Sequence, residues 1–413
     1  MDFLEFLDNC VTPYHTAATL AGYFEKAGFK AVNPVEPAAF EPGKAYFVVR
    51  GGAVVAFRVP QGVSCQSRFR IALAHTDFPT LKVTPNPDYM AAGIRTLHPE
   101  IYGSPLFTSW LDRDLGYAGL LAYEQDGAVR TKIFRGNKLF RIPQLAVHLN
   151  RGVNQDGLKL NPQTDLNILW TAVGGAERFV DALSKELPVG AKLLDYDVQM
   201  FDAQPAQRGG FDDEWIYSGR LDNLSSCHAI AESLVASKPQ EKDFVVGAFF
   251  NNEEVGSETR EGAAGNFLKS VLGSIVPNID ALLASNSLAL SIDMAHAVHP
   301  NFMQKHEPNH APVMGHGIVL KTNSQKRYAS DVYSNARFKL LCEKSGVACQ
   351  TFVMRNDMPC GSTVGPAVSA GLGVPTVDIG EAMFSMHSIR EMTAAKDHAD
   401  MIRVLNVFFS ELV

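Results

Sequence analysis

The sequence predicts an α/β fold, a mixed and largely parallel sheet interrupted by a smaller β-rich domain. Two observations carry this prediction. Apolar segments alternate with stretches that show helical spacing, which is typical of a largely parallel sheet. The middle of the chain instead shows short apolar runs that turn residues often break. The chain has 413 residues, too many for one ordinary core, so two domains are expected.

The expected elements follow in chain order. Residues 3–28 have helical spacing with an interruption near Pro13. Four segments begin as apolar strands and end in polar residues, namely FRIALAHTD (69–77), FVVGAFFNNEE (244–254), LALSIDMAHAVHP (288–300) and VPTVDIGEAMFSMHS (374–388). Further helical patterns cover residues 224–237, 263–276 and 331–347.

The β-rich insert is expected over residues 85–215, where runs such as VRTKIFRG and KLFRIPQLAVHLN occur. Residues 1–84 and 216–413 then form the two parts of the larger domain. No internal repeat is evident.

Composition excludes several classes of protein. The net charge is −7, from 37 basic and 44 acidic residues, whereas a nucleic-acid binder should be basic. No stretch approaches the ~20 apolar residues of a membrane span. The start of the chain is acidic and amphipathic and does not resemble a signal peptide. The six cysteines lack CxxC spacing, so we expect reduced thiols and a cytoplasmic protein.

Acids and imidazoles gather where apolar strands end. They are His75, Asp222, Glu253, Glu254, Asp293 and His387. Ligands of parallel sheets bind beyond the carboxyl ends of the strands, and this residue set suits two zinc ions. One carboxylate would bridge the ions, each ion would take a histidine and another acid, and one acid would remain as general base. Six residues fill this scheme, with Glu253 as base and Glu254 as ligand.

Each residue also has a simpler explanation. His75 could be a structural or surface histidine, and Asp222 an acid at a helix N-terminus. Asp293 could be a cap, and Glu253–Glu254 a surface pair. The repeated pattern favours a metal site, because burying these groups without a metal would be costly. Asp77, two residues after His75, is expected either to orient the imidazole or to serve as a turn or cap residue.

Nine segments resemble the aspartyl aminopeptidase family of dinuclear-zinc aminopeptidases, in that family's order. They are AHTDFPTLKVTP, WLDRDLGYAG, IPQLAVHLNR, SGRLDNLSSCHA, NNEEVGS, DMAHAVHPN, KHEPNHAP, MRNDMPCGSTVGP and MFSMHSIREM. The resemblance implies two zinc ions per subunit, with Asp222 bridging them and Glu253 as general base. The implied ligands are His75, Asp222, Glu254, Asp293 and His387. Manganese or cobalt is expected to substitute for zinc.

The resemblance also implies roles outside the ligand set. His148 would enter the active site of a neighbouring subunit, unless it is an inward-facing strand residue. Lys321 would receive the acidic side chain of the substrate, unless it is a solvated lysine at a strand end. The fold implied is an α/β metallopeptidase domain whose β-rich insert builds dimers, which assemble into a homo-oligomeric dodecamer. The chain departs from the family pattern at Phe78, at Ser104 and in the segment NPQTDLNILW (161–170).

The activity expected is removal of the N-terminal residue, preferably Asp or Glu, from short or unfolded peptides. Three alternatives stay open. One is a broad-specificity aminopeptidase. Another is a dizinc amidohydrolase acting on N-acyl amino acids, for which Arg355 would bind a carboxylate. The third is a chambered shell with no activity, against which the intact set of acids and imidazoles argues.

Overall fold

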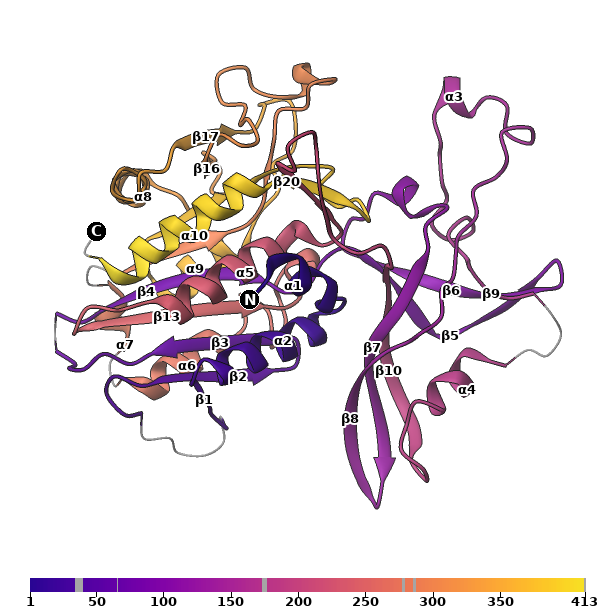
Figure 1. The fold of residues 1–413 in the computed structure, drawn as a ribbon, viewed down its shortest axis with the longest axis horizontal. Helices are drawn as coiled ribbons and strands as arrows, with labels where there is room; N and C mark the ends of the chain where they lie inside the picture. The colour runs from indigo at the N-terminus through magenta and orange to yellow at the C-terminus, as the bar shows by residue number, and fades with distance from the viewer. Residues whose placement is uncertain (34–39, 65, 173–176, 277–278, 285–286, 412–413) are drawn as a thin grey trace. The chain divides into compact units, whose positions relative to one another are not determined.

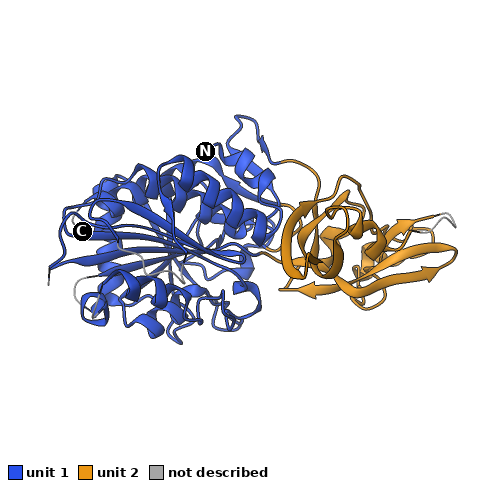
Figure 2. Ribbon diagram, turned by 90° about the horizontal axis from the view of Figure 1, so that it is seen from below, with its two compact units in different colours: residues 1–77, 206–386, 391–413 blue, residues 78–205, 387–390 orange. Residues whose placement is uncertain are grey.

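The structure is a computed structural model that describes residues 1–33, 40–64, 66–172, 177–276, 279–284 and 287–411. It divides into two compact units (Figure 2). Unit 1 comprises residues 1–77, 206–386 and 391–413, and unit 2 comprises residues 78–205 and 387–390. The second unit therefore starts before the expected residue 85 and ends its main segment before 215. The reason is strand pairing, because residues 80–83 pair within the sheet of unit 2, whereas residues 207–209 and 215–218 pair within unit 1.

Unit 1 is built on a mixed sheet of nine strands, so the predicted fold class is confirmed. In spatial order these are β1 (Lys30–Ala31), β2 (Ala45–Arg50), β3 (Ala53–Arg58), β13 (Asp243–Phe250), β4 (Arg68–His75), β14 (Leu288–Ile292), β18 (Thr376–Gly380), β16 (Ile318–Thr322) and β17 (Cys349–Val353). The four central strands, from β13 to β18, run parallel. Their carboxyl ends therefore meet at one edge of the sheet.

Helices lie on both faces of this sheet (Figures 1 and 2). They are α1 (Phe3–Asn9), α2 (Pro13–Lys26), α5 (Leu221–Ala236), α6 (Phe267–Ile275), α7 (Ile279–Ala284), α8 (Val332–Ser345), α9 (Val364–Leu372) and α10 (Ala395–Ser410). The predicted interruption near Pro13 is confirmed, because the Thr12 side chain accepts a hydrogen bond from the amide of His15 and caps α2. The sequence did not predict α7, α9 or α10.

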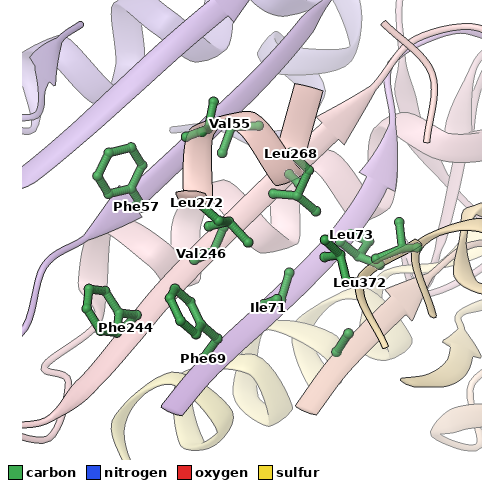
Figure 3. Close-up of a cluster of buried hydrophobic side chains, with 14 of the residues drawn as sticks. Val55, Phe57, Phe69, Ile71, Leu73, Phe244, Val246, Leu268, Leu272 and Leu372 are labelled. Atoms are coloured by element: carbon green, nitrogen blue, oxygen red, sulfur yellow. The ribbon is translucent and has the colours of Figure 1, made fainter. Parts of the chain in front are cut away.

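A large cluster of buried apolar side chains lies on one face of the sheet (Figure 3). Alternate residues of two neighbouring strands point into it, with Phe69, Ile71 and Leu73 from β4 beside Phe244 and Val246 from β13. Leu268 and Leu272 of α6 pack against them. Burial on both faces explains why these strands read as continuous apolar runs in the sequence.

A smaller five-stranded sheet completes unit 1. Its order is β11 (Gln207–Gly209), β12 (Trp215–Ser218), β20 (Glu391–Ala394), β19 (Ala382–Phe384) and β15 (Ala295–His296). Both β15 and β19 continue from strands of the large sheet, because β15 follows β14 and β19 follows β18 after one or two residues. Pairing within the small sheet therefore fixes the segments that follow β14 and β18.

Unit 2 contains a six-stranded antiparallel sheet with its own apolar core. Its order is β8 (Ala128–Arg135), β7 (Leu115–Gln125), β10 (Lys192–Asp202), β5 (Thr80–Ala91), β6 (Ile94–Tyr102) and β9 (Ile168–Thr171), and short helices cover Val153–Asp156 (α3) and Phe179–Ser184 (α4). A strand through KLFRIPQLAVHLN is not formed, because only Phe140 and Arg141 make isolated bridges. Pro143, which lacks an amide hydrogen, follows shortly after.

Within the part of the chain that the structure describes, no helix is both long and apolar enough to span a membrane. Cys10, Cys227, Cys342, Cys349 and Cys360 carry free thiols. Cys65 lies outside the described residues.

Candidate metal centre

Three predicted site residues meet at the carboxyl edge of the large sheet. His75 is the last residue of β4, Glu254 follows β13 in a short 3-10 turn, and Asp222 lies in the first turn of α5. One ligand atom from each lies within 4.8 Å of those of the other two. His75 and Glu254 meet because β4 and β13 are parallel neighbours whose carboxyl ends share one edge. Asp222 reaches the same edge from the start of α5, which Asn223 ties to the end of β14.

His75 is buried, and its two ring nitrogens face different surroundings. Its Nδ1 lies 3.0 Å from the backbone carbonyl oxygen of Asp77. Its Nε2 lies 3.5 Å from carboxylate oxygens of both Asp222 and Asp293. An Nδ1–H bonded to a carbonyl leaves Nε2 as the nitrogen that can bind a metal, which is the usual arrangement of zinc-binding histidines. Asp293 is thereby brought to the same place as Asp222.

Asp77 organises the turn that carries the two glutamates. Its carboxylate accepts hydrogen bonds from the backbone amides of Glu253 and Glu254, at 3.1 Å each. The carbonyl of Asp77 lies closer to the His75 ring than its carboxylate does, at 3.0 Å against 3.5 Å. Asp77 therefore contacts both the histidine and the glutamate turn, and it is buried.

Asp222 is positioned by a second buried acid. Its backbone amide donates to Oε2 of Glu391 at 3.0 Å. Asp222 and Asn223 have non-helical backbone angles, so regular helix begins at Leu224, where the sequence predicted it. The Asn223 side chain donates to the carbonyl of Ile292 at 2.8 Å and ties the start of α5 to the end of β14.

The carboxylates at this site repel one another when no cation is bound. Burial raises the pKa of Glu253 to about 8; His75 opposes this rise, while Asp293, Asp77 and Asp222 add to it. Burial alone would lower the pKa of His75, but Asp222, Asp293 and Asp77 outweigh it and raise that pKa well above its usual value. Several buried carboxylates around one imidazole fit divalent metal, since an added positive charge would relieve their repulsion.

Lys321 also lies at this site. It is buried in β16, so the alternative of a solvated lysine is wrong. Its ammonium group lies 3.6 Å from Oδ2 of Asp293 and donates to the carbonyl of Met294 at 3.0 Å. It also lies 5.3 Å from the ring centroid of Tyr328. Lys321 thus places a cation beside an acid of the cluster.

The two remaining predicted residues belong to unit 2. His387 adopts a left-handed backbone conformation with φ of 67°, and its Nδ1 lies 3.1 Å from the carbonyl oxygen of Ser104. His148 is exposed in a turn, so it is not an inward-facing strand residue.

The sequence analysis missed several supporting residues. Glu391 and Asn223 hold Asp222 and the start of α5, and both are buried. Asp378, buried in β18, accepts hydrogen bonds from Thr363 and from the amide of Ala329, at 2.5 and 2.6 Å. One signal was available, because Asp378 is an acid inside the apolar run VPTVDIG. Glu391 lacks even that signal, since it lies in the mixed stretch SIREMTA and not in an apolar run.

A sheet with helices on both faces and buried histidine and carboxylates at its carboxyl edge indicates an α/β metalloprotein. The family model described as aminopeptidase I zinc metalloprotease (M18) matches residues 6–409. A probable M18 family aminopeptidase 2 from Pseudomonas aeruginosa is 39% identical over 98% of this chain and 97% of its own length. The chain therefore belongs to the M18 family of zinc metallo-aminopeptidases, and it is a hydrolase that removes N-terminal residues.

Solved structures share the fold. The chain in a cryo-EM structure of the Ape4 and Nbr1 complex aligns with a TM-score of 0.92 at 32% identity, covering 99% of this chain and 84% of that one. A chain of the S. cerevisiae mApe1 dodecamer aligns with a TM-score of 0.85 at 27% identity, covering 98% and 95%. The resemblance to the aspartyl aminopeptidase family is thereby confirmed at the level of the M18 family.

Proposed function

We propose that this enzyme removes N-terminal Asp or Glu residues from short or unfolded peptides, with Glu253 as its general base. The observation that carries the proposal is the glutamate turn after β13. There one acid, Glu254, lies among the candidate ligands while its neighbour Glu253 is held beside them by the carboxylate of Asp77.

The proposed metal content is two zinc ions per subunit, held by His75, Asp222, Glu254, Asp293 and His387, with Asp222 between them. Manganese or cobalt would be accepted by the same ligands. When bound, zinc would supply a Lewis acid and lower the pKa of water, which makes a nucleophile available near neutral pH. The Nδ1 contact of His387 with a carbonyl supports its assignment, since metal-binding histidines commonly donate their other ring nitrogen.

Glu253 would take the proton of the attacking water and deliver it to the amine that leaves. A general base must stand within hydrogen-bond reach of the reacting water without being consumed as a ligand. Its half-buried carboxylate, with a pKa raised to about 8 by desolvation and neighbouring acids, suits reversible proton transfer near neutral pH.

The acidic preference is assigned to Lys321. A buried ammonium group at the edge of the site offers a charge-assisted hydrogen bond to a substrate carboxylate. Its contact with Asp293 leaves it close to the place where substrate would meet the ligand cluster. Arg355, which the amidohydrolase alternative needs for a carboxylate, is bonded through Nε and an NH₂ group to both oxygens of Asp357, at 2.8 and 2.6 Å.

The proposed assembly is a homo-oligomer in which the β-rich unit forms dimers that combine into a dodecamer. The similar S. cerevisiae mApe1 is a dodecamer, which supports the proposed subunit count. The segment around His148 supports a contact with another subunit. Leu145, Val147 and Leu149 are all exposed, at 56%, 48% and 75% of their surface. We propose that this segment carries His148 into a neighbouring active site, where the imidazole would stabilise the charge that develops on the scissile carbonyl. The mass of the native assembly in solution tests the proposed number of subunits.

A peptide panel tests the activity. Zinc-loaded enzyme is incubated with peptides that begin with Asp, Glu, Leu or Lys, beside N-acetylated copies, and cleavage is read by mass. We expect loss of one N-terminal acidic residue from the free peptides only. The Glu253→Gln variant should lose at least ~100-fold in kcat, because general-base catalysis contributes on the order of 10²–10⁴.

The zinc content of Glu253→Gln is the control, and it should equal that of the wild type because Glu253 is not assigned as a ligand. Equal cleavage of Leu and Asp peptides would refute the acidic preference and favour a broad-specificity aminopeptidase. Cleavage of the acetylated copies alone would refute the requirement for a free amine and support the amidohydrolase.

A further inference from the structure

Unit 1 contains an apolar cavity of about 250 Å³ that includes none of the candidate metal ligands. Methionine and phenylalanine side chains make up much of its wall. They are Phe352, Met354, Met358, Met383, Phe384 and Met386. These residues come from β17, from β19 and from the segments that follow those strands. Four methionines give the cavity a flexible and polarisable wall, which adapts to apolar groups of different shape.

Two of the residues that line the cavity are close neighbours of candidate site residues, one along the chain and one on a paired strand. His296 lines it and follows Asp293 by three residues, so their Cα atoms are at most about 11 Å apart. Phe352 lines it and is the registered partner of Lys321 on the neighbouring parallel strand. The Lys321 ammonium group also donates a hydrogen bond to the carbonyl of Met294, which lies between Asp293 and His296 in the chain. A peptide anchored at Lys321 therefore needs only one further residue to reach the cavity.

The charged residues of the wall are mostly neutralised by partners. Arg355 is paired with Asp357 and also donates to the carbonyl of Gln304 at 2.8 Å. Glu307 contacts Nδ1 of His310 at 2.5 Å. Burial, followed by the neighbouring His299, lowers the pKa of His306 and favours its neutral form.

Lys305 adds an exposed cation to this wall. Glu307, an acid of the cavity lining, already contacts His310, so this largely apolar wall with its exposed Lys305 disfavours lysine and arginine side chains.

We propose that this cavity binds the side chain of the second residue of the peptide and selects a large apolar one over lysine or arginine. The inference rests on the aminopeptidase function proposed above. The volume is suitable, because an apolar cavity of ~150 Å³ admits a benzene ring. Phenylalanine, methionine and leucine are therefore the expected second residues, and the residue after the cleaved bond contributes to specificity.

The test uses zinc-loaded wild-type enzyme and a series of peptides Asp-X-Ala-Ala, in which X is Phe, Leu, Ala or Lys. We expect kcat/KM to be roughly 10- to 100-fold higher for Phe and Leu than for Lys, the range that burial of one large apolar side chain supports. The Met358→Glu variant places an acid at the exposed rim of the cavity. This variant should lower the ratio of kcat/KM for the Phe peptide to that for the Lys peptide at least tenfold, mainly through KM. The reason is that the new carboxylate disfavours apolar groups and attracts lysine.

Leu340→Glu is the matched control. Leu340 lies on α8, is 45% exposed and does not line the cavity, so the same charge there should leave the ratio unchanged. The thermal midpoint of each variant shows whether it is folded. Two results would overturn the proposed subsite while leaving the aminopeptidase function standing. One is an equal kcat/KM of the wild type for all four peptides. The other is a folded Met358→Glu variant with the same ratio of kcat/KM for Phe and Lys as the wild type. Failure of the wild type to cleave any peptide would overturn that function and the subsite together.

Discussion

Asp77 connects the histidine of the candidate centre with its glutamates. Its carbonyl faces His75, and its carboxylate accepts the amides of Glu253 and Glu254. The sequence analysis expected an orienting contact with the ring, but it did not foresee that the carboxylate would fix the turn carrying the general base and a ligand. One residue therefore sets the relative position of three others.

Replacing Asp77 with Asn should weaken the site without unfolding the chain. An amide has one oxygen, so one of the two backbone amides would face an NH₂ group instead of an acceptor. We expect zinc affinity or kcat/KM to fall about 10- to 100-fold, as is typical when a partner of a metal ligand is removed. Zinc per subunit, measured against a competing chelator, checks this prediction.

Asp280→Asn serves as the control for Asp77→Asn, because Asp280 is an exposed residue of α7 with a side chain 73% accessible. It should keep wild-type zinc affinity. Wild-type zinc affinity and kcat/KM in Asp77→Asn as well would show that the turn holds its shape without the carboxylate.

At the scale of elements, the close approach of β18 to the end of β14 positions Asp293. Gly380 is the last residue of β18, and a Cβ there would lie 1.9 Å from the carbonyl oxygen of Asp293. The amide of Asp293 also donates to the carbonyl of Ile379 at 3.0 Å. Glycine is needed at this position because backbone from the neighbouring segment occupies the space of a side chain.

Gly380→Ala should displace Asp293 and therefore reduce both stability and metal binding. We expect a loss of about 1–3 kcal/mol in the free energy of unfolding, the usual cost of overpacking, together with a lower zinc content. Thermal unfolding and metal analysis of the same sample measure both effects.

Gly371→Ala provides the comparison, since a Cβ at this exposed helical position meets no atom within 4 Å. It should be neutral or stabilise α9 by up to about 1 kcal/mol. Equal behaviour of the two variants would mean that the neighbouring backbone yields easily at Gly380.

At the scale of the whole of unit 1, a buried pair of histidines joins α5 to α10, the last helix of the chain's described residues. His228 of α5 lies 2.9 Å from His398 of α10, whose other nitrogen lies 3.0 Å from Glu381. The second nitrogen of His228 faces the carbonyl of Met1. Glu232 and the N-terminal ammonium group complete the charged surroundings of His228. Burial, and then His398, lower the pKa of His228 to about 4.

This pair should make the protein less stable in mild acid. The folded pKa lies below the ordinary value near 6.5, so the unfolded chain binds the proton more tightly. The stabilisation is complete above pH 6.5 and is lost as the pH falls towards 4, by about 1.4 kcal/mol per pH unit at most. The measurement is the difference in unfolding free energy between wild type and His228→Gln at pH 8, 7, 6 and 5.

The difference between wild type and His228→Gln cancels the titration of other groups, provided that they are independent of this site. It should stay constant between pH 8 and 7 and shrink below that. A difference that does not change with pH would contradict the lowered pKa.

The sequence predicted the strands of the site well because their signal is local. An apolar run such as FVVGAFF is long enough to identify a buried strand, and the polar residue at its end is visible in the same window. His75, Glu254 and Asp293 could therefore be identified from the sequence alone. The helices at 224–237 and 331–347 were predicted for the same reason, whereas the residues before Phe267 form turns and not the expected start of a helix.

The sequence by itself thus determined the fold class, the family and the set of acids and imidazoles at the strand ends, since these depend on residue type and spacing along the chain. Tertiary structure decided what depends on contacts between distant segments. It buries Lys321 beside Asp293, places Glu391 behind Asp222 and starts the second unit at Phe78. It also assembles the methionine-lined cavity from segments that are distant in the chain, because only the folded sheets bring residues of β15, β17 and β19 to one cavity.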